Sequence, residues 1–276
     1  MKTWLEVALN GSWGKALQPG IPVSVAEIVA EGIACAREGA AIVHVHAYDE
    51  ASGQQCEDAA VYQRIIEGIR SQVDCIVYPT IPISGNMPAA ERFAAVEALA
   101  RGGLIEWSVI DPGSVNIAGH VYMNPEEHVR HGLALAARYS FRPAYAIYEP
   151  GFVRLGAALA RAAGGVPQPV YRFMFSEGFS FGFPPAEYAL DAYLRLLASE
   201  APDAPWMVGG LAVDVLKIAP AAIARGGHVR VGLEDAPLGS PRSNVDWVRA
   251  ARRVIERAGA TLASADDVRQ ASKRRT

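Results

Sequence analysis

The stretch "SVAEIVAEGIACAREGAAIVHVHAYDE", residues 24–50, contains one predicted helix followed by one predicted strand. Ser24 stands three residues before Glu27, which is the spacing of a capping box at the start of a helix. The apolar run Ile42–Ala47 then predicts a buried strand. Because the same helix–strand order returns elsewhere in the chain, this stretch is the unit from which we predict the fold.

The unit of one apolar run and one amphipathic run recurs about every 30 residues, the usual size of a strand–helix–strand motif. The predicted strands are Leu5–Asn10, Ile42–Ala47, Cys75–Ile81, Ile105–Ile110, Ala144–Glu149, Val170–Ser176, Trp206–Leu211 and Val229–Asp235. The predicted helices begin near Ala26, Tyr62, Ala89, Pro125, Phe152, Pro185, Val213 and Asn244.

Strands that alternate with helices imply right-handed crossovers and a parallel sheet. Eight such pairs predict an α/β protein with a (β/α)8 TIM barrel fold. A doubly wound sheet is the alternative, but no G-x-G-x-x-G follows the first strand. Because no Pro/Ser-rich linker divides the chain, we expect residues 1–276 to form a single domain with a short C-terminal tail.

Composition excludes several classes of function. The net charge of −3 argues against nucleic acid or an anionic membrane as the main partner. No apolar run reaches the length of a membrane span, and the N-terminus lacks the apolar core of a signal peptide. Three scattered cysteines without a C-x-x-C motif argue against a disulfide framework. We therefore expect a cytoplasmic protein.

His44 and His46 are two residues apart in a predicted strand, so they point to the same face. Two interpretations are open for this pair: buried histidines with satisfied hydrogen bonds, or two ligands of one metal ion. Burying two neighbouring imidazoles is costly unless each finds a partner. The other histidines in the middle of the chain, His120, His128 and His131, are expected to be solvated.

The last predicted strand ends in "RVGLED", residues 230–235. In a closed barrel the second and eighth strands both flank the first, so the histidine pair and this segment should meet. Glu234 can then supply a third ligand, and two His with one Glu and an open position is a pattern of catalytic zinc sites. Asp235 would stand beside the metal as a base, with Arg230 nearby. The alternative is a structural Arg–Glu pair with a solvated Asp.

Hydroxyl side chains follow the third and fourth strands, where they suit a carboxylate or a phosphate. They are Thr80, Ser84, Ser108 and Ser114. Trp13 follows the first strand and can either form a wall of a substrate pocket or pack under a loop.

Five motifs together resemble the β-keto acid cleavage enzyme family, including 3-keto-5-aminohexanoate cleavage enzymes. They are "ALNG", "IVHVHAYDEASG", "DPGSVN", "GGHVRVGLED" and "ASADDVR", which span nearly the whole chain. The resemblance implies a zinc-dependent (β/α)8 barrel that is usually a homotetramer. It also implies conversion of a β-keto acid and acetyl-CoA into acetoacetate and an acyl-CoA.

Carried onto this sequence, the family's metal ligands fall on His44, His46 and Glu234. Its catalytic aspartate falls on Asp235, and the arginine partner of that aspartate falls on Arg230. The residues that hold the substrate carboxylate fall near Thr80 and Ser108.

The sequence departs from the family pattern around the predicted mouth of the barrel. Tyr48 stands where the family commonly has Arg, Ile81 where it often has Thr, and Trp107 where it often has a small residue. With Trp13 and Tyr48 as aromatic walls, the pocket is expected to suit an uncharged or a cationic acyl group.

Two other functions compete with this interpretation. An amidohydrolase-like metal hydrolase also carries His-x-His, but on its first strand and with further histidines at strands five and six, where this chain has none. A barrel that binds a metal or a small ligand without catalysis is the second alternative.

Overall fold

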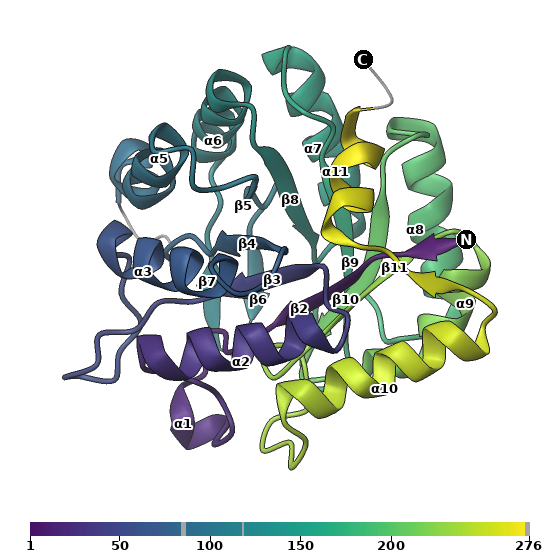
Figure 1. Ribbon diagram of the computed structural model, residues 1–276. Helices are drawn as coiled ribbons and strands as arrows, with labels where there is room; N and C mark the ends of the chain where they lie inside the picture. Colours follow the sequence, from purple (N-terminus) through teal and green to yellow (C-terminus); the bar gives the residue numbers. More distant parts are fainter. Residues whose placement is uncertain (84–86, 118, 274–276) are drawn as a thin grey trace.

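The computed structural model describes residues 1–83, 87–117 and 119–273, and Ser84 therefore lies outside the described residues. Eight parallel strands curl into a nearly closed barrel surrounded by helices (Figure 1). In chain order the barrel strands are β2 (Leu5–Ala8), β3 (Ile42–Val45), β4 (Ile76–Pro79), β5 (Trp107–Val109), β8 (Arg142–Ile147), β9 (Val170–Ser176), β10 (Trp206–Leu211) and β11 (His228–Val231). The predicted (β/α)8 fold is confirmed.

The strands follow the order β4-β3-β2-β11-β10-β9-β8-β5 around the barrel. β4 and β5 are the two ends of this sheet and pack side by side, with the rings of Tyr78 and Trp107 5.9 Å apart. β3 and β11 both pair with β2, as the barrel prediction required. We call the end of the barrel where the strands finish the mouth, and the opposite end the floor.

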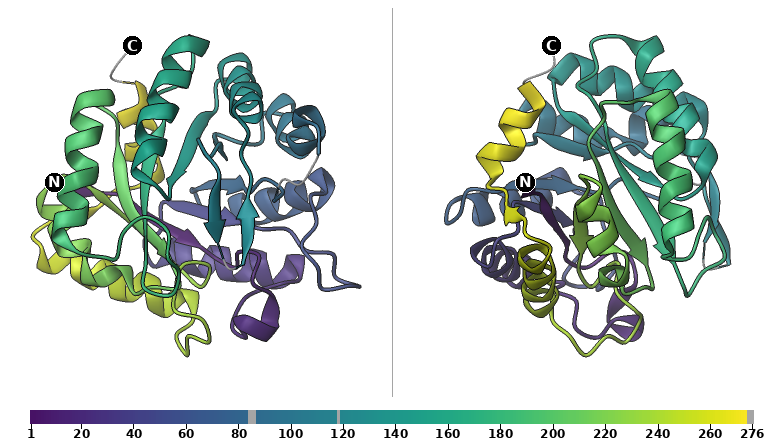
Figure 2. Two further views of the ribbon diagram at one scale, coloured as in Figure 1. Left: turned by 180° about the vertical axis from the view of Figure 1, so that it is seen from behind. Right: turned by 90° about the vertical axis from the view of Figure 1, so that its right-hand side faces the viewer.

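The helices form an outer layer, which Figure 2 shows from two further sides. They are α1 (Gly14–Leu17), α2 (Val25–Arg37), α3 (Ala59–Arg70), α4 (Ala89–Arg92), α5 (Ala94–Arg101), α6 (Glu126–Tyr139), α7 (Pro150–Ala163), α8 (Glu187–Glu200), α9 (Ala219–Ala224), α10 (Asn244–Arg257) and α11 (Ala265–Lys273). The capping box of Ser24 and Glu27 is present at the start of α2. Within the described ranges, no helix is both long and apolar enough to cross a bilayer.

Some elements were not predicted because they are too short for a periodic pattern to emerge. β1 (Lys2–Thr3) pairs with β12 (Thr261–Leu262) at the floor, where α11 also lies, since Lys2 pairs with Asp267. An antiparallel hairpin of β6 (Val115–Ile117) and β7 (His120–Tyr122) follows β5 at the mouth.

The helix predicted to begin near Val213 is instead two pieces. A short 3-10 turn, η1 (Val215–Lys217), comes first, and α9 follows with Pro220 in its first turn. Proline lacks a backbone N–H, so it favours the start of a new helix over the interior of a continuous one.

Candidate active site

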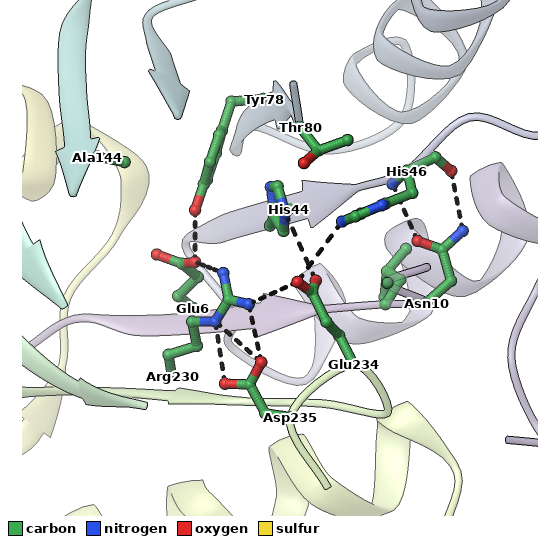
Figure 3. Close-up of polar contacts among 12 residues, drawn as sticks. Glu6, Asn10, His44, His46, Tyr78, Thr80, Ala144, Arg230, Glu234 and Asp235 are labelled. Atoms are coloured by element: carbon green, nitrogen blue, oxygen red, sulfur yellow. Dashed lines mark hydrogen bonds and ion pairs between the residues drawn. The ribbon is translucent and has the colours of Figure 1, made fainter. Parts of the chain in front are cut away.

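His44, His46 and Glu234 meet at the mouth of the barrel (Figure 3). His44 lies on β3, His46 just after it, and Glu234 three residues beyond the end of β11. The Nε2 atoms of the two histidines each lie 3.5 Å from a carboxylate oxygen of Glu234. The three potential ligand atoms lie within 4.8 Å of one another. The two strands that sequence analysis placed on either side of β2 thus bring these groups together.

The trio fits a single divalent cation. Nε2 of His46 and Oε2 of Glu234 are buried atoms without a hydrogen bond to any described residue. Buried polar atoms are normally satisfied, so unpaired atoms gathered at one point indicate a missing partner. Two imidazoles and one carboxylate form a donor set typical of catalytic zinc.

Polar contacts fix the orientation of His46. Its backbone N–H donates to Oδ1 of Asn10 at 2.9 Å, and its carbonyl accepts from Nδ2 of Asn10 at 2.9 Å. Its Nδ1 lies 3.0 Å from Oε1 of Gln55, and Gln55 in turn donates to Glu57 at 2.5 Å. With Nδ1–H donated to Gln55, the lone pair of Nε2 faces the cation site.

Burial and charge move the pKa values of the three groups in different directions. Burial holds the pKa of His44 well below its usual range, with Arg230 adding to the effect. Burial also lowers the pKa of His46, but the negative charge of Glu234 outweighs it and raises the pKa. Burial raises the pKa of Glu234, yet Arg230 and the histidines hold it well below the usual value. Glu234 is therefore ionised and available as a ligand.

Arg230 connects Glu234 to Asp235 (Figure 3). Its Nη2 lies 3.1 Å from Oε1 of Glu234 and donates to Oδ1 of Asp235 at 2.8 Å, while its Nε donates to Oδ2 of Asp235 at 3.0 Å. Oδ2 also accepts from the backbone N–H of Gly210 at 3.2 Å. Burial raises the pKa of Asp235 to about 6, against the lowering effect of Arg230. The pair has the composition of a positioned base and its charge partner.

The segment that carries Glu234 and Asp235 is a turn, although it was predicted as strand. β11 ends at Val231, and Gly232 has a φ of 133°. A Cβ at Gly232 would collide with the carbonyl of Ala8, so only glycine lets the chain turn this close to β2.

A cavity of about 90 Å³ opens beside the trio. Thr80 and Trp13 line it, as predicted, and Nε1 of Trp13 donates to the carbonyl of Glu234 at 2.7 Å. Ser108, Tyr48 and Asp235 are not among its lining residues, whereas Arg230 is. Ser108 is fully buried, and its neighbour Val109 lines the cavity instead. The Tyr48 hydroxyl donates to the carbonyl of Gly11 at 2.6 Å, which holds the turn behind Trp13.

A buried polar network beneath the trio was not predicted from the sequence. Glu6 accepts from the Tyr78 hydroxyl at 2.6 Å and from Nη1 of Arg230 at 3.0 Å. Arg172, on β9, donates to the Tyr78 hydroxyl at 2.9 Å and lies 3.6 Å from Asp111. A signal was available: Glu6 and Arg172 are charged residues inside otherwise apolar strands, where an unpaired charge would be costly.

The solvated state predicted for the other histidines holds for His120, which is exposed and lines the cavity at the mouth. It is wrong for His128, which is 3 % exposed and lies 3.4 Å from Nη1 of Arg92. His128 sits on the inner face of amphipathic α6, which a search for ligands alone does not reveal.

These features define a (β/α)8-barrel enzyme with a candidate cation site at its mouth. The model of the beta-keto acid cleavage enzyme family matches residues 2–273. The chain therefore belongs to the beta-keto acid cleavage enzyme family, as its motifs indicated, and this match favours that family over the amidohydrolases.

Two relatives match most of the chain. It is 29% identical over 236 residues to the 3-oxoadipate:acetyl-CoA acetyltransferase of Cupriavidus necator, covering 84% of this chain and 79% of the relative. It is 26% identical over 263 residues to the 3-keto-5-aminohexanoate cleavage enzyme of Fusobacterium nucleatum, covering 93% and 92%. Among solved structures, the binary complex of ObcA with oxaloacetate has a TM-score of 0.76 at 17% identity, over 92% of this chain and 67% of that one. This last likeness supports the fold.

Proposed function

We propose that this protein converts a β-keto acid and acetyl-CoA into acetoacetate and the CoA thioester of the remaining acyl group, with one zinc ion held by His44, His46 and Glu234. The observation that carries the proposal is the convergence of three buried ligand atoms beside the Arg230–Asp235 pair. Family membership and the acetyl-CoA in the name of the Cupriavidus relative support the reaction type.

In the reaction, Asp235 accepts a proton from the CH₂ group between the keto and carboxylate carbons. A raised pKa makes Asp235 a stronger base than an ordinary carboxylate while leaving it mostly ionised at neutral pH. Arg230 lines the cavity and holds both oxygens of Asp235, so it orients the base and places positive charge beside the substrate. When bound, zinc supplies a Lewis acid for the substrate oxygens.

The remaining steps follow from the family resemblance. The deprotonated carbon attacks the carbonyl of acetyl-CoA and expels the CoA thiolate. The thiolate then attacks the keto carbon and takes the acyl group as the carbon–carbon bond breaks, and acetoacetate leaves once its carbon has regained the proton held by Asp235. Atoms balance, because the acetyl and acyl groups exchange places between sulfur and carbon. In this scheme Thr80 is assigned to the substrate carboxylate and Trp13 to the pocket wall, because both line the cavity. A homotetrameric, cytoplasmic enzyme completes the proposal.

The test uses one purified sample of the full chain. Metal analysis should find one zinc per chain, and β-keto acids with acetyl-CoA should yield acetoacetate in a coupled assay. Chelation should abolish turnover, and added zinc should restore it. Full activity in metal-free protein contradicts the zinc assignment, and a flat trace over a broad panel of keto acids favours a non-catalytic barrel.

Asp235→Asn tests the role of the base independently of zinc binding. This variant should keep its zinc and lose turnover on the order of 10³-fold, the size of a general-base contribution. Glu177→Gln is a matched control, because Glu177 is an exposed carboxylate that directly follows β9 and pairs only with Lys217 among the residues described. It should leave both zinc content and turnover unchanged.

A further inference from the structure

The cavity at the mouth has two chemically different halves. The half formed by β3, β4 and the turn after β11 carries the candidate ligands and Thr80. The other half is formed by the consecutive strands β5, β8, β9 and β10, which line it with apolar side chains apart from Arg172. Those four strands contribute Val109, Ala146, Met174 and Leu211. A substrate whose keto and carboxylate groups face the first half must direct its acyl chain toward the second.

Two charged residues, Asp111 and Arg172, also line this half, and each already makes two hydrogen bonds within the protein. Asp111 accepts from the backbone N–H of Ala146 at 2.6 Å and, through its other oxygen, from the Tyr122 hydroxyl at 2.9 Å. Arg172 donates through Nη1 to the Tyr78 hydroxyl at 2.9 Å and through Nη2 to the carbonyl of Ala144 at 3.1 Å. Its Nε has no partner among the described residues, but it is enclosed rather than exposed to the cavity.

The two charges also compensate each other. Arg172 lies 3.6 Å from Asp111 and 3.7 Å from Glu6. Both residues of the first pair are buried, with 2 % of Arg172 and 4 % of Asp111 exposed. An incoming ammonium would find the charge of Asp111 already compensated by Arg172, and an incoming carboxylate would find that of Arg172 compensated by Asp111 and Glu6. A charge placed there loses its water without gaining a free counter-charge.

We infer that the acyl group of the substrate is uncharged and apolar, and that Ala146 and Met174 set the chain length that fits. This inference rests on the proposed function and specifies its substrate class. Ala146 presents the smallest side chain of this wall, so it leaves room for the acyl chain. Met174 is a flexible side chain on the neighbouring strand and limits the depth.

The first test compares three β-keto acids with the same six-carbon backbone: 3-oxohexanoate, 3-oxohexanedioate and 5-amino-3-oxohexanoate. They differ at the end of the acyl chain by a methyl group, a carboxylate or an added ammonium. With zinc-loaded enzyme and saturating acetyl-CoA, kcat/KM should be at least about 100-fold higher for the neutral acid than for either charged acid. Equal or better use of a charged acid overturns the inference.

The second test changes the wall. Ala146→Val should lower kcat/KM for 3-oxohexanoate about tenfold or more and affect 3-oxopentanoate much less. Met174→Ala should shift preference the other way, toward 3-oxooctanoate, by about fourfold per added methylene. Opposite shifts cannot arise from general misfolding. Ala94→Val, on the exposed side of α5, is the control and should keep the wild-type preference. If neither wall variant changes the preference, the assignment of Ala146 and Met174 is wrong.

The proposed reaction and the apolar acyl site can be contradicted separately. If none of these acids gives acetoacetate, the proposed function fails. Calorimetric affinities of the three six-carbon acids for the zinc-loaded protein then still test the cavity: tightest binding of 3-oxohexanoate supports an apolar acyl site, and tightest binding of either charged acid overturns it.

Discussion

The mouth and the floor of the barrel both bury polar groups that lack partners, but they arrange them differently. At the mouth, the potential ligand atoms of His44, His46 and Glu234 lie within 4.8 Å of one another, and Nε2 of His46 and Oε2 of Glu234 have no hydrogen-bond partner among the described residues. At the floor, Nε and Nη1 of Arg142 have no hydrogen-bond partner among the described residues. The neighbours of Arg142 are the rings of Trp4 and Trp107, whose centroids lie 5.8 and 5.7 Å from its guanidinium carbon. Trp107 begins β5, so its predicted position around the mouth is wrong.

His228 belongs to the same floor cluster, and its environment is equally unlike a ligand set. Its ring stacks on Trp4 at 4.1 Å, and its Nδ1 accepts the backbone N–H of Trp4 at 3.2 Å. The difference between the two ends teaches that burial and an unpaired nitrogen do not by themselves mark a metal site. Convergence of several ligand types on one point does. Mouth variants should therefore lose chemistry, and floor variants should lose stability.

The largest effect is expected at the mouth. His46→Ala should lower turnover by at least about 10³-fold, because it removes a ligand of the ion on which the proposed chemistry depends. Bound zinc should fall to background by metal analysis, while circular dichroism should retain the wild-type signal. A variant that keeps its zinc would contradict the ligand assignment.

Two tryptophans give a matched pair for the contrast between the ends. Trp4→Ala at the floor should lower the free energy of unfolding by about 3–5 kcal/mol, since Trp4 is 4 % exposed, while kcat/KM of the folded fraction stays within about threefold of wild type. Trp13→Ala at the mouth should do the reverse, with an activity loss of about tenfold and little change in stability, because Trp13 is half-buried and lines the cavity. Urea unfolding and steady-state kinetics on both variants measure this. If Trp4→Ala abolishes activity in folded protein, the separation of the two ends fails.

At the floor, the buried side chain of His228 links stability to pH. Burial lowers the pKa of His228 from 6.5 to about 3. The unfolded chain therefore takes up a proton below about pH 6.5 that the folded protein refuses until about pH 3, so stability is lost as the pH falls through this window. Between pH 7 and pH 5, protonation of His228 in the unfolded chain should lower the free energy of unfolding by about 2 kcal/mol.

His228→Asn isolates that contribution from those of other titrating groups. Asparagine can still accept the Trp4 N–H but does not titrate. The difference in unfolding free energy between wild type and variant should therefore change by about 2 kcal/mol between pH 7 and pH 5. A difference that stays constant with pH would show that His228 does not titrate in this range on unfolding.

The sequence predicted the features that follow from a repeated pattern, and not those that depend on the orientation of single side chains. The barrel came from strand–helix repetition, and the closeness of His44 and Glu234 came from barrel topology. The orientation of single side chains did not follow. Ser108 and Val109 are adjacent on β5, and only the register against β8 decides which of them faces the cavity. Arg172 and Asp111 are far apart in sequence, so no local pattern could show that they compensate each other.

The smallest predicted effect concerns Gln55, which contacts His46 but not the candidate ion. Its Oε1 lies 3.0 Å from Nδ1 of His46 and holds the imidazole so that Nε2 faces the site. Gln55→Ala should weaken zinc affinity on the order of tenfold, as removal of such an orienting contact usually does, without changing the number of zinc ions bound at saturation. Competition with a chelator of known affinity measures this. Gln54→Ala is the control, because Gln54 is exposed and contacts neighbouring loop residues through its backbone. An equal loss in both variants would assign the effect to the loop, and an unchanged Gln55→Ala would mean that Asn10 alone sets the orientation of His46.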